Sequence, residues 1–397
     1  MRTLTRVASA GSAATAIAFG PARVGFGLFL PQFREEFGIS TSTAGLISSA
    51  GFAAFLMGLI GSYLMILRFG PRAPIVAGMV LALLGLTTAA MAPNALMLAL
   101  GVFFASASAG LAWTPFNDAA KRALYDEERP EALSVISSGT AVGVMGAGVF
   151  ALALVLGGFD WRLAWAAFAL ASGLAALANF IALSDTTGPD GGVTRAMAER
   201  LAERSAIPLF LVAASFGVTN GIYVTFAADR VSGLGGLPGL PAEASAAIVF
   251  SAYGAAGLIG LATARVKSGI GLAWLLRLLH VGAATSIALI AFVPQSWPGL
   301  IVSAGLQGIY VMMLSATLSM WSERLFPAIP SLSFTAALLV TALGNVGGPA
   351  IAGIAADSFG AVPMFAATAA VALATALVLK PGILRERPEP EPKPAAA

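Results

Sequence analysis

The sequence predicts an all-α polytopic membrane protein with twelve transmembrane helices, arranged as two pseudo-symmetric bundles of six helices each. Of its 397 residues, 58% are hydrophobic and only 10% are charged, whereas a soluble domain carries about 25% charged residues. The mean hydropathy is +0.87. A membrane-spanning helix needs about 20 apolar residues, so the chain has room for about twelve spans with their loops. These values exclude a water-soluble globule.

Apolar stretches long enough to cross a bilayer occur in two series along the chain. The first series lies at about 12–33, 43–66, 72–92, 96–121, 131–157 and 162–184, and the second at about 207–229, 242–264, 270–293, 298–322, 330–356 and 360–380. Turn-forming residues separate them, such as Gly70-Pro71 and the run from Gly233 to Pro241. Apolar residues do not alternate every second position, as the strands of a membrane β-barrel require.

The first span follows Arg2 and Arg6, a pattern that is also typical of a signal peptide. The apolar run continues past Arg23 to Phe33, so we expect an uncleaved first helix. The predicted organisation is an N-terminal bundle at 1–184, an interdomain loop at 185–206, a C-terminal bundle at 207–380 and a disordered tail at 381–397.

The two halves look like distant copies of each other. Ser49-Ala-Gly-Phe-Ala-Ala54 in span 2 aligns with Ser251-Ala-Tyr-Gly-Ala-Ala256 in span 8, at an offset of about 202 residues. Internal repeats of this kind are typical of transporter folds.

Basic residues predict the orientation of the chain in the membrane. With the N-terminus inside, about 17 of the 22 Lys and Arg lie on the cytoplasmic side, about three lie outside and two lie within spans. Cytoplasmic loops carry the excess of Lys and Arg. We therefore expect both termini in the cytoplasm, and we read the positive charge as topology rather than as a nucleic-acid site.

Composition also limits the chemistry. The chain has no cysteine and a single histidine, His280, so thiol catalysis, cysteine-ligated metals and disulfides are excluded, and we expect no cofactor and no metal. It has no Gly-x-x-x-x-Gly-Lys-Ser/Thr loop for ATP. A hydrolase would need a nucleophile, a base and an orienting group, so we do not expect an enzyme.

Arg23 is the charge that the sequence places deepest in the membrane, about eleven residues into span 1. An arginine facing lipid at the centre of a helix costs at least about 2.5–3.5 kcal/mol, so Arg23 should face a water-filled cavity or a partner. No carboxylate is predicted at its depth, which favours an anionic ligand. The alternative is a structural role, in which Arg23 bonds to backbone carbonyls near Gly25 and Gly27.

The stretch between spans 2 and 3 reads Tyr63-Leu-Met-Ile-Leu-Arg68-Phe-Gly70-Pro-Arg72. It is similar to the Gly-x-Leu-Ala-Asp-Arg-x-Gly-Arg-Arg motif of the major facilitator superfamily, although Leu67 replaces the aspartate. Together with the two halves of six spans, this resemblance covers about residues 8–380. The opening of span 1, from Pro21 to Pro31, resembles the bacterial branch labelled YbfB/YjiJ.

The resemblance implies a cytoplasmic gate of charged residues. Arg72 would pair with Asp118 at the inner end of span 4, and the mirror set in the second half would join Arg265 or Lys267 to Glu323. The expected gating residues are Arg68, Gly70, Arg72, Asp118, Arg265, Lys267 and Glu323.

The resemblance also implies that spans 1, 4, 5, 7, 8, 10 and 11 line a central cavity and that spans 3, 6, 9 and 12 are peripheral. Polar and aromatic residues at mid-membrane depth are then the candidates for substrate binding. They are Arg23, Phe26, Trp113, Ser138, Asn220, Tyr223, Tyr253, Gln307, Tyr310, Thr341 and Asn345. For each of them, hydrogen bonding or packing between helices is the alternative.

The function that this pattern favours is secondary active transport of a small organic anion by alternating access. The membrane would be a bacterial-type cytoplasmic membrane, and we expect a monomer whose partners are the solute and lipids, with no nucleic acid. The resemblance implies proton coupling, but no deep carboxylate is predicted as a carrier, so facilitated and exchange transport stay open. Export of amphipathic drugs is the alternative within the fold, and a membrane sensor or intramembrane enzyme is the disfavoured alternative outside it.

Overall fold

The computed structural model describes residues 3–184, 186, 206–326, 330–380 and 384. Twelve helical segments in this part of the chain are long and apolar enough to cross a membrane, which confirms the predicted number of spans. Most of the predicted interdomain loop at 185–206 and of the predicted tail at 381–397 lies outside the described residues.

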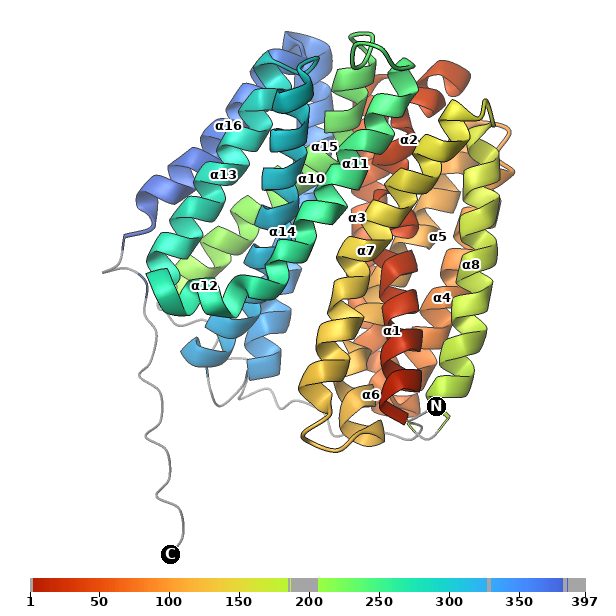
Figure 1. Cartoon of the computed structure of the whole chain (residues 1–397), viewed down its shortest axis with the longest axis vertical. Coiled ribbons are helices and arrows are strands. Elements are labelled where there is room, and N and C mark those ends of the chain that lie inside the picture. The colour runs from red at the N-terminus through yellow and green to blue at the C-terminus, as the bar shows by residue number, and fades with distance from the viewer. Residues whose placement is uncertain (1–2, 185, 187–205, 327–329, 381–383, 385–397) are drawn as a thin grey trace, which may run out of the picture.

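The helices form two bundles that lie side by side (Figure 1). The N-terminal bundle contains α1 (Thr3–Phe19), α2 (Pro21–Phe37), α3 (Thr41–Phe69), α4 (Arg72–Ala90), α5 (Ala95–Trp113), α6 (Pro115–Ala123), α7 (Arg129–Leu156) and α8 (Trp161–Ala182). The C-terminal bundle contains α10 (Ile207–Ser232), α11 (Ala242–Gly257), a 3-10 turn (Leu258–Ala262), α12 (Thr263–Ile270), α13 (Leu272–Phe292), α14 (Trp297–Leu325), α15 (Pro330–Phe359) and α16 (Ala361–Val378).

The first span is a pair of helices rather than one continuous helix. Gly20 separates α1 from α2 with φ −77° and ψ −109°, outside the helical region, and Pro21 opens α2. Proline has no N–H to continue the hydrogen-bonded ladder. A Cβ at Gly20 would also collide with the carbonyl of Gly143 on α7. The break therefore lies at a close crossing of span 1 and α7, and it places Arg23 in the first turn of α2.

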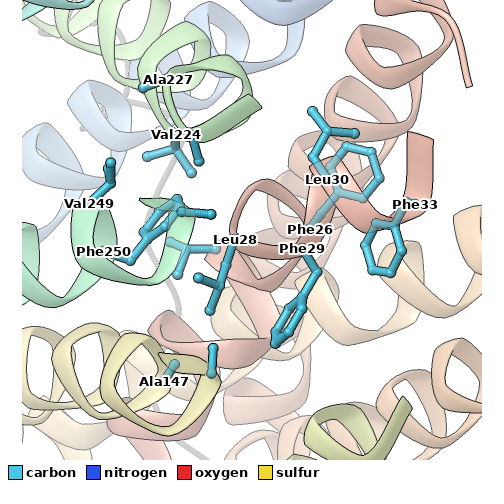
Figure 2. Packing of buried hydrophobic residues seen from close by; sticks show 14 of the residues in the cluster. Phe26, Leu28, Phe29, Leu30, Phe33, Ala147, Val224, Ala227, Val249 and Phe250 are labelled. Carbon is cyan, nitrogen blue, oxygen red and sulfur yellow. The ribbon is translucent and has the colours of Figure 1, made fainter. Parts of the chain in front are cut away.

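The two bundles share one apolar core, and it lies in one half of the molecule. We call the end that contains the α2–α3 connection at Gly38 the upper face, and the end where α1 begins the lower face, as drawn in Figure 1. The shared core joins residues of α2 to residues of α10 and α11. Figure 2 shows Leu28 of α2 pointing toward Phe250 of α11. Burial of such side chains contributes about 1.5–3 kcal/mol each, relative to exposure.

Glycines bring the backbones of the two bundles together in this upper half. A Cβ at Gly27 would overlap the carbonyl of Val224, and one at Gly45 would overlap the carbonyl of Pro349. On α7, a Cβ at Gly148 would lie 2.6 Å from the amide nitrogen of Ser251. Small residues at helix interfaces allow such approach without intervening lipid.

Below this contact zone each bundle has a core built almost entirely from its own residues. One apolar cluster joins α1, α3, α4, α5, α6, α7 and α8, with Ala342 of α15 as its one member from the other bundle, and another joins α10, α13, α14, α15 and α16. The bundles are therefore closed against each other above and apart below. This is the arrangement that creates a cavity open toward the lower face.

We predict that Gly148→Ala destabilises the closed upper half, because the added methyl group collides with the α11 backbone. The chain has no native cysteine, so a Ser48→Cys, Thr225→Cys pair reports the closed state by oxidative cross-linking. These side chains come from opposite bundles, and their oxygens are 2.6 Å apart. We expect this pair to cross-link several-fold more slowly when Gly148→Ala is added than when Gly148 is retained.

Gly146→Ala on the same helix is the matched control, since its Cβ would meet nothing within 4 Å. An equal loss of cross-linking in both variants would contradict the proposed collision.

Candidate functional site

A cavity of about 450 Å³ lies between the two bundles, within the size range of sites for small molecules. Residues from α1, α2, α3, α5, α6, α7, α10, α11, α14 and α15 line it. Helices α4, α8, α13 and α16 contribute no lining residue among those described, as the resemblance implied for spans 3, 6, 9 and 12. Lining by α3 was not expected.

The cavity ends at Arg23 and opens in the opposite direction. At the closed end, Arg23 and Val24 of α2 face Val224 of α10 and Tyr253 of α11, next to the shared core. Toward the lower face the lining includes Asn117 of α6, whose side chain is exposed.

Aromatic rings surround the guanidinium of Arg23. Its central carbon lies 4.6 Å from the ring centroid of Phe55, 5.3 Å from that of Phe19 and 5.6 Å from that of Phe52. A cation within about 6 Å of a ring face is stabilised by the ring quadrupole. In the described part of the chain, Arg23 makes no hydrogen bond and no ion pair. The structure therefore does not show the alternative role of bonding to backbone carbonyls near Gly25 and Gly27.

Tyr253 of α11 lies opposite Arg23, within electrostatic range of it. Its side chain is buried, and its hydroxyl makes no hydrogen bond among the described residues. Asn220 on the same side donates to Asn345 Oδ1 over 3.2 Å, while its own Oδ1 is buried without a partner in the part of the chain that the structure describes. The closed end of the cavity thus combines one cation from the N-terminal bundle with an unused hydroxyl and amide oxygen from the C-terminal bundle.

The structure brings six of the predicted binding residues to the cavity wall, and the other five lie elsewhere. The six are Arg23, Trp113, Ser138, Asn220, Tyr253 and Thr341. Of the remaining five, Phe26 packs in the shared core and stacks on Phe33 at 5.8 Å between ring centroids. Asn345 accepts the hydrogen bond from Asn220 behind the wall.

Three of these five residues lie inside the C-terminal bundle. The Tyr223 hydroxyl bonds to Ser303 over 3.1 Å, and the Tyr310 hydroxyl bonds to Thr219 over 3.2 Å. The contacts of Tyr223 and Tyr310 are hydrogen bonds between helices, the alternative that the sequence left open for each residue. Gln307 lies on α14 with Tyr310 and is fully buried, but neither polar atom of its side chain has a hydrogen-bond partner among the described residues.

An ion pair that the sequence analysis missed closes the upper face. Arg34 of α2 donates to Asp229 of α10, with 2.7 Å between Nη1 and Oδ2. The amide of Ser42 donates to Asp357 of α15 over 2.9 Å. Both contacts join the two bundles above the cavity. The sequence shows charged residues at the outer ends of spans 1, 7 and 11, and these could have indicated contacts there. Which of them pair depends on the rotation of each helix, which the sequence does not show.

A second ion pair on the upper face lies within the N-terminal bundle. Glu36 accepts two hydrogen bonds from Arg162, at 2.5 Å and 2.9 Å, and one from the indole of Trp161 at 2.7 Å. This contact ties α2 to α8 and crosses no boundary between bundles.

At the lower face, Arg72 donates to the carbonyl of Phe180 over 2.7 Å and stacks on that ring at 3.9 Å. Arg68 is exposed at the end of α3, and Gly70 ends that helix with φ +79°, which favours glycine. Asp118 lies in the first turn of α6. The pairing of Arg72 with Asp118 stays a prediction.

In the second half, Arg265 and Lys267 lie on α12, and Glu323 lies near the end of α14. Arg265 and Glu323 are exposed, whereas Lys267 is buried. The mirror gate therefore also stays a prediction.

Twelve spans in two bundles around a central cavity define a membrane transporter. The sequence model described as "Major Facilitator Superfamily" matches residues 12–281. The chain belongs to this superfamily and is a transporter rather than an enzyme. No curated protein matches the sequence significantly.

Solved structures of transporters share the fold. A POT family transporter in complex with 5-aminolevulinic acid has a TM-score of 0.79 at 16% identity, and the alignment covers 97% of each chain. A variant of the nucleoside transporter NupG has a TM-score of 0.77 at 13% identity, covering 95% of this chain and 99% of the other. A variant of the peptide transporter POT has a TM-score of 0.69 at 15% identity, covering 95% and 91%.

We predict that Asp229→Asn weakens the upper closure, because it removes the charge that pairs with Arg34. A partly exposed ion pair contributes about 0.5–1 kcal/mol, or about a 2- to 5-fold change in the equilibrium. Maleimide labelling of a Ser319→Cys variant, in the lower part of the cavity, should slow by at most this factor.

Glu36→Gln is the control, since its ion pair lies within one bundle. Equal slowing in the two variants would show that the effect does not come from separating the bundles.

Proposed function

We propose that this protein moves a small organic anion across the membrane by alternating access of the cavity around Arg23. The observation that carries the proposal is a cation at the closed end of the cavity with no carboxylate partner among the described residues. At 4 Å and an effective dielectric constant of about 20, a bound carboxylate would gain about 4 kcal/mol before desolvation. An anionic substrate would thus supply the missing counter-charge.

The lining also argues against the alternative of cationic drug export. No aspartate or glutamate is among the described residues that line the cavity. A cationic drug would meet Arg23 at the closed end with no compensating acid. Amphipathic anions remain compatible with the wall.

For the orientation, we propose that both chain ends lie in the cytoplasm of a bacterial-type cell, as the distribution of basic residues predicts. The cavity then opens inward, and the Arg34–Asp229 pair closes the outer side. One chain contains both bundles around the cavity, which supports transport by a monomer. Proton coupling stays a prediction from the superfamily, because no described carboxylate lies on the cavity.

The test is uptake of radiolabelled organic acids into proteoliposomes. Arg23→Ala should reduce uptake of the transported acids at least about tenfold, since a hydrogen bond to a charged group is worth about 1.5–3 kcal/mol. Arg23→Lys should restore part of it, because lysine keeps the charge but lacks the planar fork of donors.

Arg277→Ala is the matched control. Arg277 is another arginine within a span, but it donates to the carbonyl of Leu379 at the periphery of the C-terminal bundle. Uptake that Arg23→Ala leaves unchanged would exclude Arg23 as the anion site.

A further inference from the structure

We infer that the substrate is a singly charged anion with an apolar body, whose carboxylate is held between Arg23 of one bundle and Tyr253 of the other. This inference rests on the proposed function and assigns a substrate class to the same site. Three features of the cavity support this inference. They are the number of charges on its wall, the apolar and aromatic wall beside Arg23, and the position of the hydrogen-bond donors that have no partner among the described residues.

The number of charges limits the substrate to one negative charge. Arg23 is the sole lysine, arginine, aspartate or glutamate among the described lining residues. A dicarboxylate or a phosphate dianion would bring a second charge into a wall that has no second cation. A buried charge without a partner is costly, so such ligands should bind more weakly than a monocarboxylate.

The wall beside Arg23 is apolar and aromatic. Phe19 contacts Phe55 at 6.4 Å and Trp113 at 4.9 Å between ring centroids, and Phe116 lies one turn beyond Trp113 on the next helix. All four residues line the cavity. We call them the aromatic wall. It runs from the guanidinium toward the open end, so an anion held by Arg23 directs its body along these rings.

The unused donors lie at the same end as the charge. Arg23 and the Tyr253 hydroxyl both lack hydrogen-bond partners among the described residues, and they come from opposite bundles. A carboxylate has two oxygens and accepts from several donors. A carboxylate between them would therefore bridge the bundles at the level where the halves meet.

This bridge gives the substrate a direct effect on closure of the cavity. A ligand shifts a conformational equilibrium only through its different affinity for the two states. An anion that contacts both bundles gains both contacts only while Arg23 and Tyr253 are close together. A ligand without a carboxylate loses both anchors, and a carboxylate without an apolar body loses the aromatic wall.

The experiment measures binding to the purified full-length protein, by competition with radiolabelled phenylacetate. Acetate tests the apolar body, phenylacetamide tests the charge, and succinate compared with acetate tests the second charge. We expect all three to bind at least about tenfold more weakly than phenylacetate, because acetate lacks the apolar body, phenylacetamide lacks the charge, and succinate lacks the apolar body and carries a second charge. This ranking uses the unaltered protein, so it does not depend on the folding of any variant.

Two variants then separate the anchors from the wall. Trp113→Ala should weaken the binding of phenylacetate about five- to tenfold and leave the binding of acetate unchanged, because acetate does not reach the ring. Tyr253→Phe removes only a hydroxyl and should weaken the binding of phenylacetate and of acetate by the same factor, about tenfold.

The outcomes distinguish this inference from the proposed function. If succinate binds as tightly as phenylacetate and Trp113→Ala has no effect, while Arg23→Ala abolishes binding of both, the substrate class is wrong and the organic-anion function stands. If Arg23→Ala changes the binding of none of these acids, both the inference and the proposed function are overturned.

Discussion

The two bundles are joined in their upper half by direct backbone contact, and the cavity depends on this contact. Gly27, Gly45 and Gly148 lie where a side chain would collide with the opposite bundle, and apolar side chains from α2, α10 and α11 fill the space around them. Below this zone each bundle has a core built almost entirely from its own residues. Because the join covers only one half of the molecule, the space between the bundles is closed at one end and open at the other.

The position of the closed end determines what the cavity can bind. Arg23 lies there because Gly20 and Pro21 break the first span just before it, where the span crosses α7. The guanidinium is surrounded by rings rather than by carboxylates. Rings stabilise the cation without neutralising it, so the charge stays available to a ligand. The ion pair between Arg34 and Asp229 lies above it and holds the upper face closed.

The structure also explains why many polar residues at similar depth have different roles. Tyr223 and Tyr253 both lie within spans of the C-terminal bundle, yet the Tyr223 hydroxyl bonds to Ser303, whereas the Tyr253 hydroxyl faces the cavity without a partner among the described residues. A span rotated by one residue turns a side chain by about 100°, since a helix has 3.6 residues per turn. Depth alone therefore does not distinguish a binding residue from a packing residue.

The sequence by itself determined the membrane environment, the twelve spans, the two halves and Arg23 as the exceptional deep charge, because hydropathy and charge are properties of single segments. Only the tertiary structure decided that Tyr253 faces Arg23 while Tyr310 and Gln307 do not line the cavity, and that Arg34 pairs with Asp229 across 195 positions of sequence. The physical reason is that helix rotation and crossing are set by close packing between small residues on different spans, and hydropathy does not contain that information.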